Sequence, residues 1–227
     1  MALIKTGAIV TQISGKVGGQ TFGKGQSGAY IKNTGSYINK RSGIRDERKA
    51  VLTSVTGLWR QLSDAQKNSW IALAPSFPYT NRVGDVSYYS GFNLFTKFNY
   101  NLQLDGQSPI PTAPTVSTVT PPTLVSVAVG SGTAKVTTDV SSTAGSAKIY
   151  CSKPLSPGNT QYRRSLRMLT IAPFNTINAG IDIVSLIEGI FGDYPDGARY
   201  YVELLPFDTN TGQPIGTPVN TNWIADN

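Results

Sequence analysis

The first 45 residues consist of short extended pieces separated by glycine, and this pattern restricts what they can fold into. The pieces are ALI, AIVTQI, QTF, AYIK and SYIN, and each carries only one or two apolar or aromatic side chains. None shows the 3.6-residue period of an amphipathic helix. So little apolar surface cannot offset the entropy lost on ordering, so no core is expected here. The sequence therefore predicts an extended, glycine-rich arm over residues 1–46.

One stretch of this arm imitates a nucleotide-binding loop. Residues 18–24, GGQTFGK, match seven of the eight positions of G-x-x-x-x-G-K-[ST]. The eighth position should carry the hydroxyl that binds magnesium, and Gly25 stands there instead. No amphipathic helix follows Lys24, so we expect neither nucleotide nor any other cofactor.

The arm is also strongly basic. Residues 1–48 carry eight Lys or Arg and only two acidic residues, in a chain with a net charge of +7. Two interpretations compete: a solvated tail, or a segment that becomes ordered on a partner by adding strands to its sheets and placing aromatic side chains in its pockets. We favour the second. The expected contact residues are Ile13, Val17, Phe22, Lys24, Tyr30, Lys32, Tyr37, Lys40 and Arg41.

Composition argues against catalysis. The chain has no histidine, which removes the commonest general base and most zinc sites. The acidic cluster Glu188, Asp193 and Asp196 lacks the order of a calcium loop. Cys151 lies in an alternating apolar run and is expected to be a buried small hydrophobe. No apolar run approaches the ~20 residues that span a bilayer. We expect no enzyme activity, no metal site and no membrane partner.

Residues 47–106 are expected to form a small helical segment with a short hairpin. The first helix has one apolar face, made of Val51, Val55, Leu58 and Leu62. Ser63 and Gln66 then form the capping box of a second helix. Trp59 and Trp70 are interpreted as the core of this helix pair rather than as a platform for bases or sugars.

A hairpin and a third helix complete that segment. FPYTNRVGDVSYY predicts the hairpin, with its turn near Gly84. Ser90 is the expected cap of the third helix, in which Leu94, Phe98 and Leu102 share one face. Residues 107–122, rich in proline and without charge, predict an extended linker.

Residues 123–227 alternate as strands do, in TLVSVAVG, GTAKVTTDV, SAKIYCSK and RYYVELLPFD. RYYVELLPFD follows a Pro-Asp-Gly turn and resembles the penultimate strand of a fibronectin type III domain, with Tyr200 as its tyrosine corner. IDIVSLIEGIF predicts a short helix or an extra strand. Arg163, Arg164 and Arg167 are interpreted as a solvated or interface-rim cluster, with phosphate contact as the alternative. The expected fold is α+β or mainly β, ending in a fibronectin III or Ig-like β-sandwich.

Three blocks in a fixed order carry a further resemblance: ISGKVGGQTF with SGAYIKN, then WRQLSDAQKNSW, then SGFNLF. Over residues 7–104 they resemble a recurrent family of tailed-bacteriophage virion proteins. The resemblance implies a virion structural protein, present in multiple copies and bound to other virion proteins. Capsid-associated decoration or cementing is the first expectation, and a neck, portal-ring or tail-adaptor position is the alternative. A nucleic-acid-binding protein using the basic arm is a further alternative.

Overall fold

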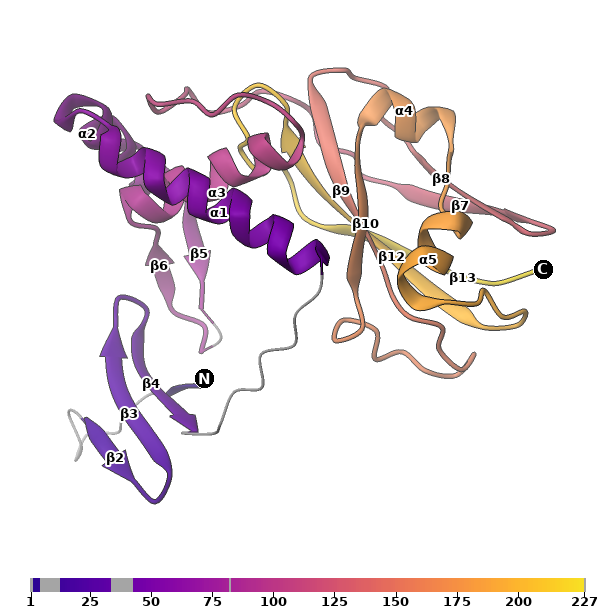
Figure 1. Ribbon diagram of the computed structural model, residues 1–227, viewed down its shortest axis with the longest axis horizontal. Helices are drawn as coiled ribbons and strands as arrows, with labels where there is room; N and C mark the ends of the chain where they lie inside the picture. Colours follow the sequence, from indigo (N-terminus) through magenta and orange to yellow (C-terminus); the bar gives the residue numbers. More distant parts are fainter. Residues whose placement is uncertain (1, 5–12, 34–42, 82, 227) are drawn as a thin grey trace. The chain divides into compact units, whose positions relative to one another are not determined.

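The computed structural model describes the whole chain except residues 1, 5–12, 34–42, 82 and 227. Helices and several antiparallel sheets are both present, so the expected α+β class is confirmed (Figure 1). The chain divides into two compact units. The first contains Met1–Thr96 and Pro111–Ala113, and the second contains Lys97–Ile110 and Pro114–Asn227. The four-part division expected from the sequence stays a prediction.

The N-terminal segment forms a four-stranded antiparallel sheet in the order β1-β4-β3-β2. Its strands are β1 (Ala2–Ile4), β2 (Gly15–Val17), β3 (Gln20–Gly25) and β4 (Gly28–Asn33). The sequence analysis predicted the extended pieces. It was wrong to predict a single extended arm here, because the pieces pair with one another in one sheet. Gly18 and Gly19 adopt φ of 53° and 78°, so β2 and β3 fold back on each other as a hairpin. The strands thereby satisfy one another's backbone hydrogen bonds.

The helices of the first unit follow the predicted local signals. They are α1 (Gly43–Gln61), α2 (Asp64–Leu73), the one-turn η1 (Ala74–Ser76) and the start of α3 (Gly91–Leu104). The capping box is confirmed, because Gln66 N donates to Ser63 Oγ and Ser63 N donates to Gln66 Oε1. The predicted hairpin is β5 (Pro78–Thr80) paired with β6 (Val86–Tyr88). Helix α1 starts at Gly43, ahead of the expected start at Glu47.

Aromatic side chains build the core of this unit. Trp70 is fully buried and meets the ring of Phe95 edge-on at 5.4 Å, as predicted for a helix core. Trp59 also contacts Phe95, at 5.2 Å between ring centroids. Helix α3 begins against α2 so closely that a Cβ on Gly91 would lie 2.9 Å from the backbone nitrogen of Ile71. Only glycine fits this crossing.

The second unit contains the C-terminal part of α3, two antiparallel sheets and two short helices. One sheet has the order β10-β9-β12-β13 and the other has the order β11-β8-β7. In chain order the elements are β7 (Val125–Gly130), β8 (Thr133–Thr138), β9 (Gly145–Cys151), β10 (Arg167–Pro173), α4 (Phe174–Ala179), β11 (Ile181–Asp182), α5 (Val184–Phe191), β12 (Arg199–Asp208) and β13 (Val219–Ile224). The predicted strands are present, and IDIVSLIEGIF supplies both an extra strand and a helix.

Both sheets and both short helices contribute to one buried apolar cluster. Val136 of β8, Ile149 of β9, Ile187 of α5 and Val202 of β12 are all fully buried within it. Cys151 is buried in the same cluster, as predicted.

The tyrosine-corner interpretation of Tyr200 was wrong. Its hydroxyl is buried and has no hydrogen-bond partner among the described residues, whereas a corner requires a bond to upstream backbone. Its ring instead stacks with that of Tyr194, at 5.0 Å, and with that of Trp223, at 5.4 Å, and Trp223 Nε1 donates a hydrogen bond to the Tyr194 hydroxyl. This aromatic stack fixes the side chain in the core.

Candidate functional site

Of the expected contact residues, Val17, Phe22, Lys24, Tyr30 and Lys32 lie on strands of the N-terminal sheet, and Ile13 precedes β2. Val17 is 71% exposed and Ile13 is 36% exposed, and Lys24 and Lys32 are also exposed. Phe22 and Tyr30 are half-buried. No residue in positions 3–4 and 13–33, the part of this segment whose side chains are described, is buried. Tyr37, Lys40 and Arg41 lie outside the described residues.

The strand register gives this sheet two different faces. Residues directly opposite each other in an antiparallel pair point to the same side. Phe22 is paired with Ile31, which is in turn paired with Ala2, and Val17 and Ile4 fall on the same side. We call Ile4, Val17, Phe22 and Ile31 the apolar face. None of these four side chains is fully buried, so this face exposes apolar surface that a partner could cover.

The other side carries Lys16, Tyr30 and Lys32, which we call the basic face, together with Leu3, whereas Lys24 lies on the apolar side. Tyr30 pairs with Gly23, and its ring covers that glycine: a Cβ on Gly23 would lie 2.7 Å from the Tyr30 hydroxyl. The structure therefore separates two residues that the sequence analysis grouped as anchors. Phe22 and Tyr30 point to opposite sides of the sheet.

The turn between β3 and β4 is held by the β5–β6 hairpin. Ser27 Oγ lies 2.6 Å from the hydroxyl of Tyr79, and Asn81 Nδ2 donates to the Ser27 carbonyl at 3.2 Å. Gln26 Nε2 donates to the Tyr88 carbonyl at 3.4 Å.

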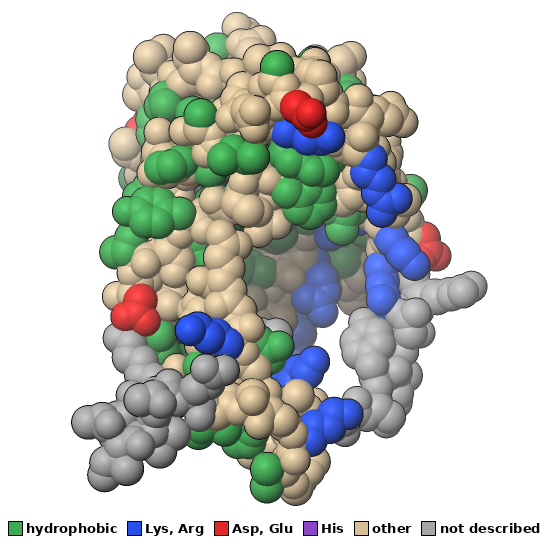
Figure 2. Space-filling model, turned by 90° about the vertical axis from the view of Figure 1, so that its left-hand side faces the viewer, with side chains coloured by type: hydrophobic (Ala, Val, Ile, Leu, Met, Phe, Trp, Pro, Cys, Tyr) green, Lys and Arg blue, Asp and Glu red, His purple; other side chains and the backbone are tan. Residues whose placement is uncertain are grey.

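Figure 2 shows apolar side chains at the surface, interspersed with Lys and Arg. On this side of the molecule, Lys and Arg are more prominent than Asp and Glu.

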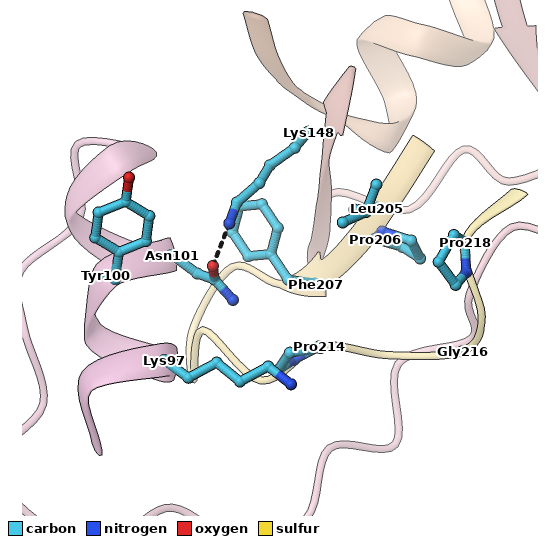
Figure 3. Close-up of a pocket in the computed structure, with 10 residues that line it drawn as sticks. All are labelled: Lys97, Tyr100, Asn101, Lys148, Leu205, Pro206, Phe207, Pro214, Gly216 and Pro218. Atoms are coloured by element: carbon cyan, nitrogen blue, oxygen red, sulfur yellow. Dashed lines mark hydrogen bonds between the residues drawn. The ribbon is translucent and has the colours of Figure 1, made fainter. Parts of the chain in front are cut away.

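The second unit has a cavity of about 380 Å³ (Figure 3). Helix α3, strand β9, the end of β12 and the loop after it line the cavity with Lys97, Tyr100, Asn101, Lys148, Leu205, Pro206, Phe207, Pro214, Gly216 and Pro218. Figure 3 shows Lys148 reaching toward Asn101 and Lys97 extending toward Pro214. A mainly apolar cavity with a few polar groups is typical of small-ligand sites.

Hydrogen bonds fix the polar groups of this cavity. Asn101 is buried, and its Nδ2 donates to the Gly212 carbonyl at 2.7 Å. Its Oδ1 accepts from Lys148 Nζ, which also lies 5.5 Å from the Tyr100 ring centre and 5.9 Å from that of Phe207. The sequence analysis missed this site. The signal that marks it is an asparagine beside the apolar stripe of α3, where a polar side chain needs partners.

A second, more polar recess lies in the loop between β9 and β10. Its volume is about 680 Å³, and Lys153, Arg164 and Arg167 contribute three cationic side chains to its lining. The basic cluster noted in the sequence is thus divided: Arg164 and Arg167 line the recess, and Arg163 is not among the lining residues.

Burial changes the pKa of Cys151 and that of Asp105. Burial raises the pKa of the Cys151 thiol, which therefore stays protonated and unreactive at neutral pH. Burial also raises the pKa of Asp105, and a hydrogen bond from Ser146 partly opposes that rise. Within the described part of the chain, no group of three or more His, Cys, Asp or Glu side chains could hold a metal ion.

The comparisons with known proteins return nothing for this chain. No protein-family model matches it, and neither the curated proteins nor the solved structures include a match. No helix in the described ranges is both long and apolar enough to cross a membrane.

Proposed function

We propose that this chain is a structural protein of a tailed-bacteriophage virion, anchored through its N-terminal sheet to a neighbouring virion protein. The position that we favour is on the capsid, as a decoration or cementing protein. The family resemblance of residues 7–104 supports the bacteriophage assignment. The observation that carries the assembly role is the apolar face of the sheet, which has no buried residue although its four side chains come together from four strands.

The apolar face of this sheet exposes side chains that a partner would bury. Burial of apolar surface contributes about 25 cal/mol per Å², so a partner covering this face would supply stability that the sheet lacks alone. Lys24, which is exposed on the apolar side of the sheet, would meet an acidic side chain at the rim of the same partner. Exposed charge pairs contribute only ~0.2–1 kcal/mol each, so the apolar contacts would dominate attachment.

We further infer that residues 123–227 form a fibronectin type III-like sandwich. Counted along the second unit, the first, second and fifth strands make one sheet, and the third, fourth, sixth and seventh make the other. This distribution is that of a fibronectin type III domain, and the two sheets share one apolar cluster as sandwich sheets do. The missing tyrosine corner and the two short helices are departures from the usual pattern.

Two neighbouring residues of β2 allow a matched test of the anchoring role. Val17→Asp places a carboxylate on the apolar face, and Lys16→Asp places one on the basic face of the same strand. Each variant is expressed with a tag during infection by the phage that carries this chain, and its copies per purified particle are counted by quantitative mass spectrometry. We expect Val17→Asp to reduce incorporation at least tenfold and Lys16→Asp to reduce it much less.

Two results would contradict the proposal. Absence of the unsubstituted chain from purified particles would exclude a virion role. Equal incorporation of Val17→Asp and the unsubstituted chain would exclude docking through the apolar face. Both tagged variants are checked for native folding by circular dichroism beforehand, and Val17 is exposed enough for its substitution to leave the fold intact.

A further inference from the structure

The recess between β9 and β10 has the composition of an anion site. Besides its three cationic side chains it is lined by Asn159, Thr160, Gln161 and Ser165, together with Leu155 and Gly158. No acidic and no aromatic side chain is among the described residues that line it. An anionic ligand would therefore meet arginine, lysine, amide and hydroxyl groups, without a carboxylate on the wall to repel it.

The walls of the recess are held in place by the sheet beneath. Tyr162 stacks on Tyr201 of β12, with ring centres 4.2 Å apart and planes 6° from parallel. The Tyr201 hydroxyl donates to the Asn159 carbonyl at 3.2 Å. Leu155 is joined to Arg199 by two backbone hydrogen bonds, of 3.0 Å and 2.8 Å. The backbone of the loop that carries the cationic side chains is thus held against the sheet before a ligand binds.

The three arginines of this loop have different surroundings. The pKa of the Arg163 guanidinium is raised, mainly by a hydrogen bond with the Tyr162 side chain and to a smaller extent by the charge of Glu203 in β12. Arg163 is not among the residues that line the recess. Arg164 and Arg167 instead face the recess, where the described lining offers no carboxylate.

We propose that this recess binds the phosphate or sulfate group of an anionic oligosaccharide. The guanidinium groups of Arg164 and Arg167 and the ammonium of Lys153 would hold the oxyanion, since arginine matches the oxygens of such groups with two parallel hydrogen bonds. The neighbouring amide and hydroxyl side chains suit the hydroxyls of the attached sugar. Nucleic acid fits less well, because single strands bind on aromatic platforms and the described lining has none.

The test measures binding of the full-length chain to four probes by isothermal titration calorimetry, at several salt concentrations. The probes are a heparin-derived hexasaccharide, a phosphorylated pentamannose, a desulfated hexasaccharide of the same length and a ten-nucleotide single-stranded DNA. The variants are Arg164→Ala with Arg167→Ala, Lys153→Gln alone, and Arg163→Ala as the matched control. Thermal unfolding of each variant verifies its fold.

We expect binding of the sulfated or the phosphorylated probe and none of the desulfated one, and the preferred probe identifies the source of the oxyanion. The double variant should lose about tenfold in affinity per arginine, or ~1.4 kcal/mol each, with Arg163→Ala within threefold of the unsubstituted chain. If the double variant does not fold, Lys153→Gln alone tests the site, and we expect it to lose affinity for the same probe. Equal losses in binding free energy per charge removed, for Arg163→Ala and for the double variant, would reduce the effect to net charge and overturn the proposal. Absence of glycan binding, or DNA binding that is tighter than glycan binding, would overturn it as well.

Discussion

Substitution of Gly212 by alanine tests the packing of the C-terminal part of α3 against the turn after β12, within the second unit. Gly212 lies in the turn after β12, with φ of +68°, and its carbonyl accepts the hydrogen bond from Asn101. A Cβ at this position would lie 2.1 Å from the Phe98 carbonyl oxygen and 2.9 Å from Leu102 Cγ. Neither neighbour can move freely, because Phe98 and Leu102 are both buried and Phe98 O belongs to the helix backbone.

Two terms set the size of the effect. A non-glycine residue in the left-handed region costs roughly 1–2 kcal/mol. Insertion of a methyl group into a filled space costs about 1–3 kcal/mol more, since the helix must shift. We therefore expect Gly212→Ala to lower the free energy of unfolding of this unit by ~2–5 kcal/mol.

Gly132 provides the matched control. It has nearly the same conformation, with φ of +65°, but a Cβ there would meet nothing within 4 Å. Gly132→Ala should therefore cost only the ~1–2 kcal/mol of backbone strain. The assay is urea unfolding followed by fluorine NMR of 5-fluorotryptophan, in which buried Trp223 reports on the second unit. The reasoning fails if Gly212→Ala is no more destabilising than Gly132→Ala.

Three further outcomes follow from single groups. Ser63→Ala should destabilise the first unit by ~1 kcal/mol in urea unfolding, because the N-cap hydrogen bond to Gln66 is lost, whereas Ser63→Gly should cost only a few tenths. Cys151 should resist thiol reagents in the folded chain and react only after unfolding, as followed by mass spectrometry, and fast modification of the native protein would show that its burial is wrong. Calorimetry should detect no magnesium-dependent ATP binding, because Gly25 stands in the place of the metal-binding hydroxyl; micromolar binding that Lys24→Ala abolishes would refute this.

Local signals in the sequence predicted the helices well. The capping box of Ser63 and Gln66 depends on residues three apart, and its two hydrogen bonds are present. The apolar stripe of α3 is buried, and the Cys151 strand is a core strand, because alternation and helical periodicity are properties of neighbouring residues. The Pro-Asp-Gly turn before β12 is present as well, with Gly197 at φ of 71°.

Features that depend on distant residues could not be predicted in this way. The apolar face exists only because the register brings Val17, Phe22 and Ile31 to one side, and register is a pairing property of several strands. Strand β10 was missed for a different reason, since its seven residues do not alternate between buried and exposed positions and the strand ends at Pro173. The recess between β9 and β10 was missed because its lining residues are spread over a polar loop. In the sequence alone, Arg164 and Arg167 cannot be distinguished from a solvated cluster.

Amide hydrogen exchange in free and assembled states tests the central claim most directly. The claim is that the N-terminal sheet is completed by a neighbouring virion protein that covers its apolar face. Exchange of the peptide that spans β3 and β4 is measured by mass spectrometry in the purified chain and in intact particles, with the α2 peptide as an internal control. We expect the β3–β4 peptide to exchange at least a hundredfold more slowly in particles, while the buried side of α2 changes little. Equally fast exchange of that peptide in both states would contradict the account.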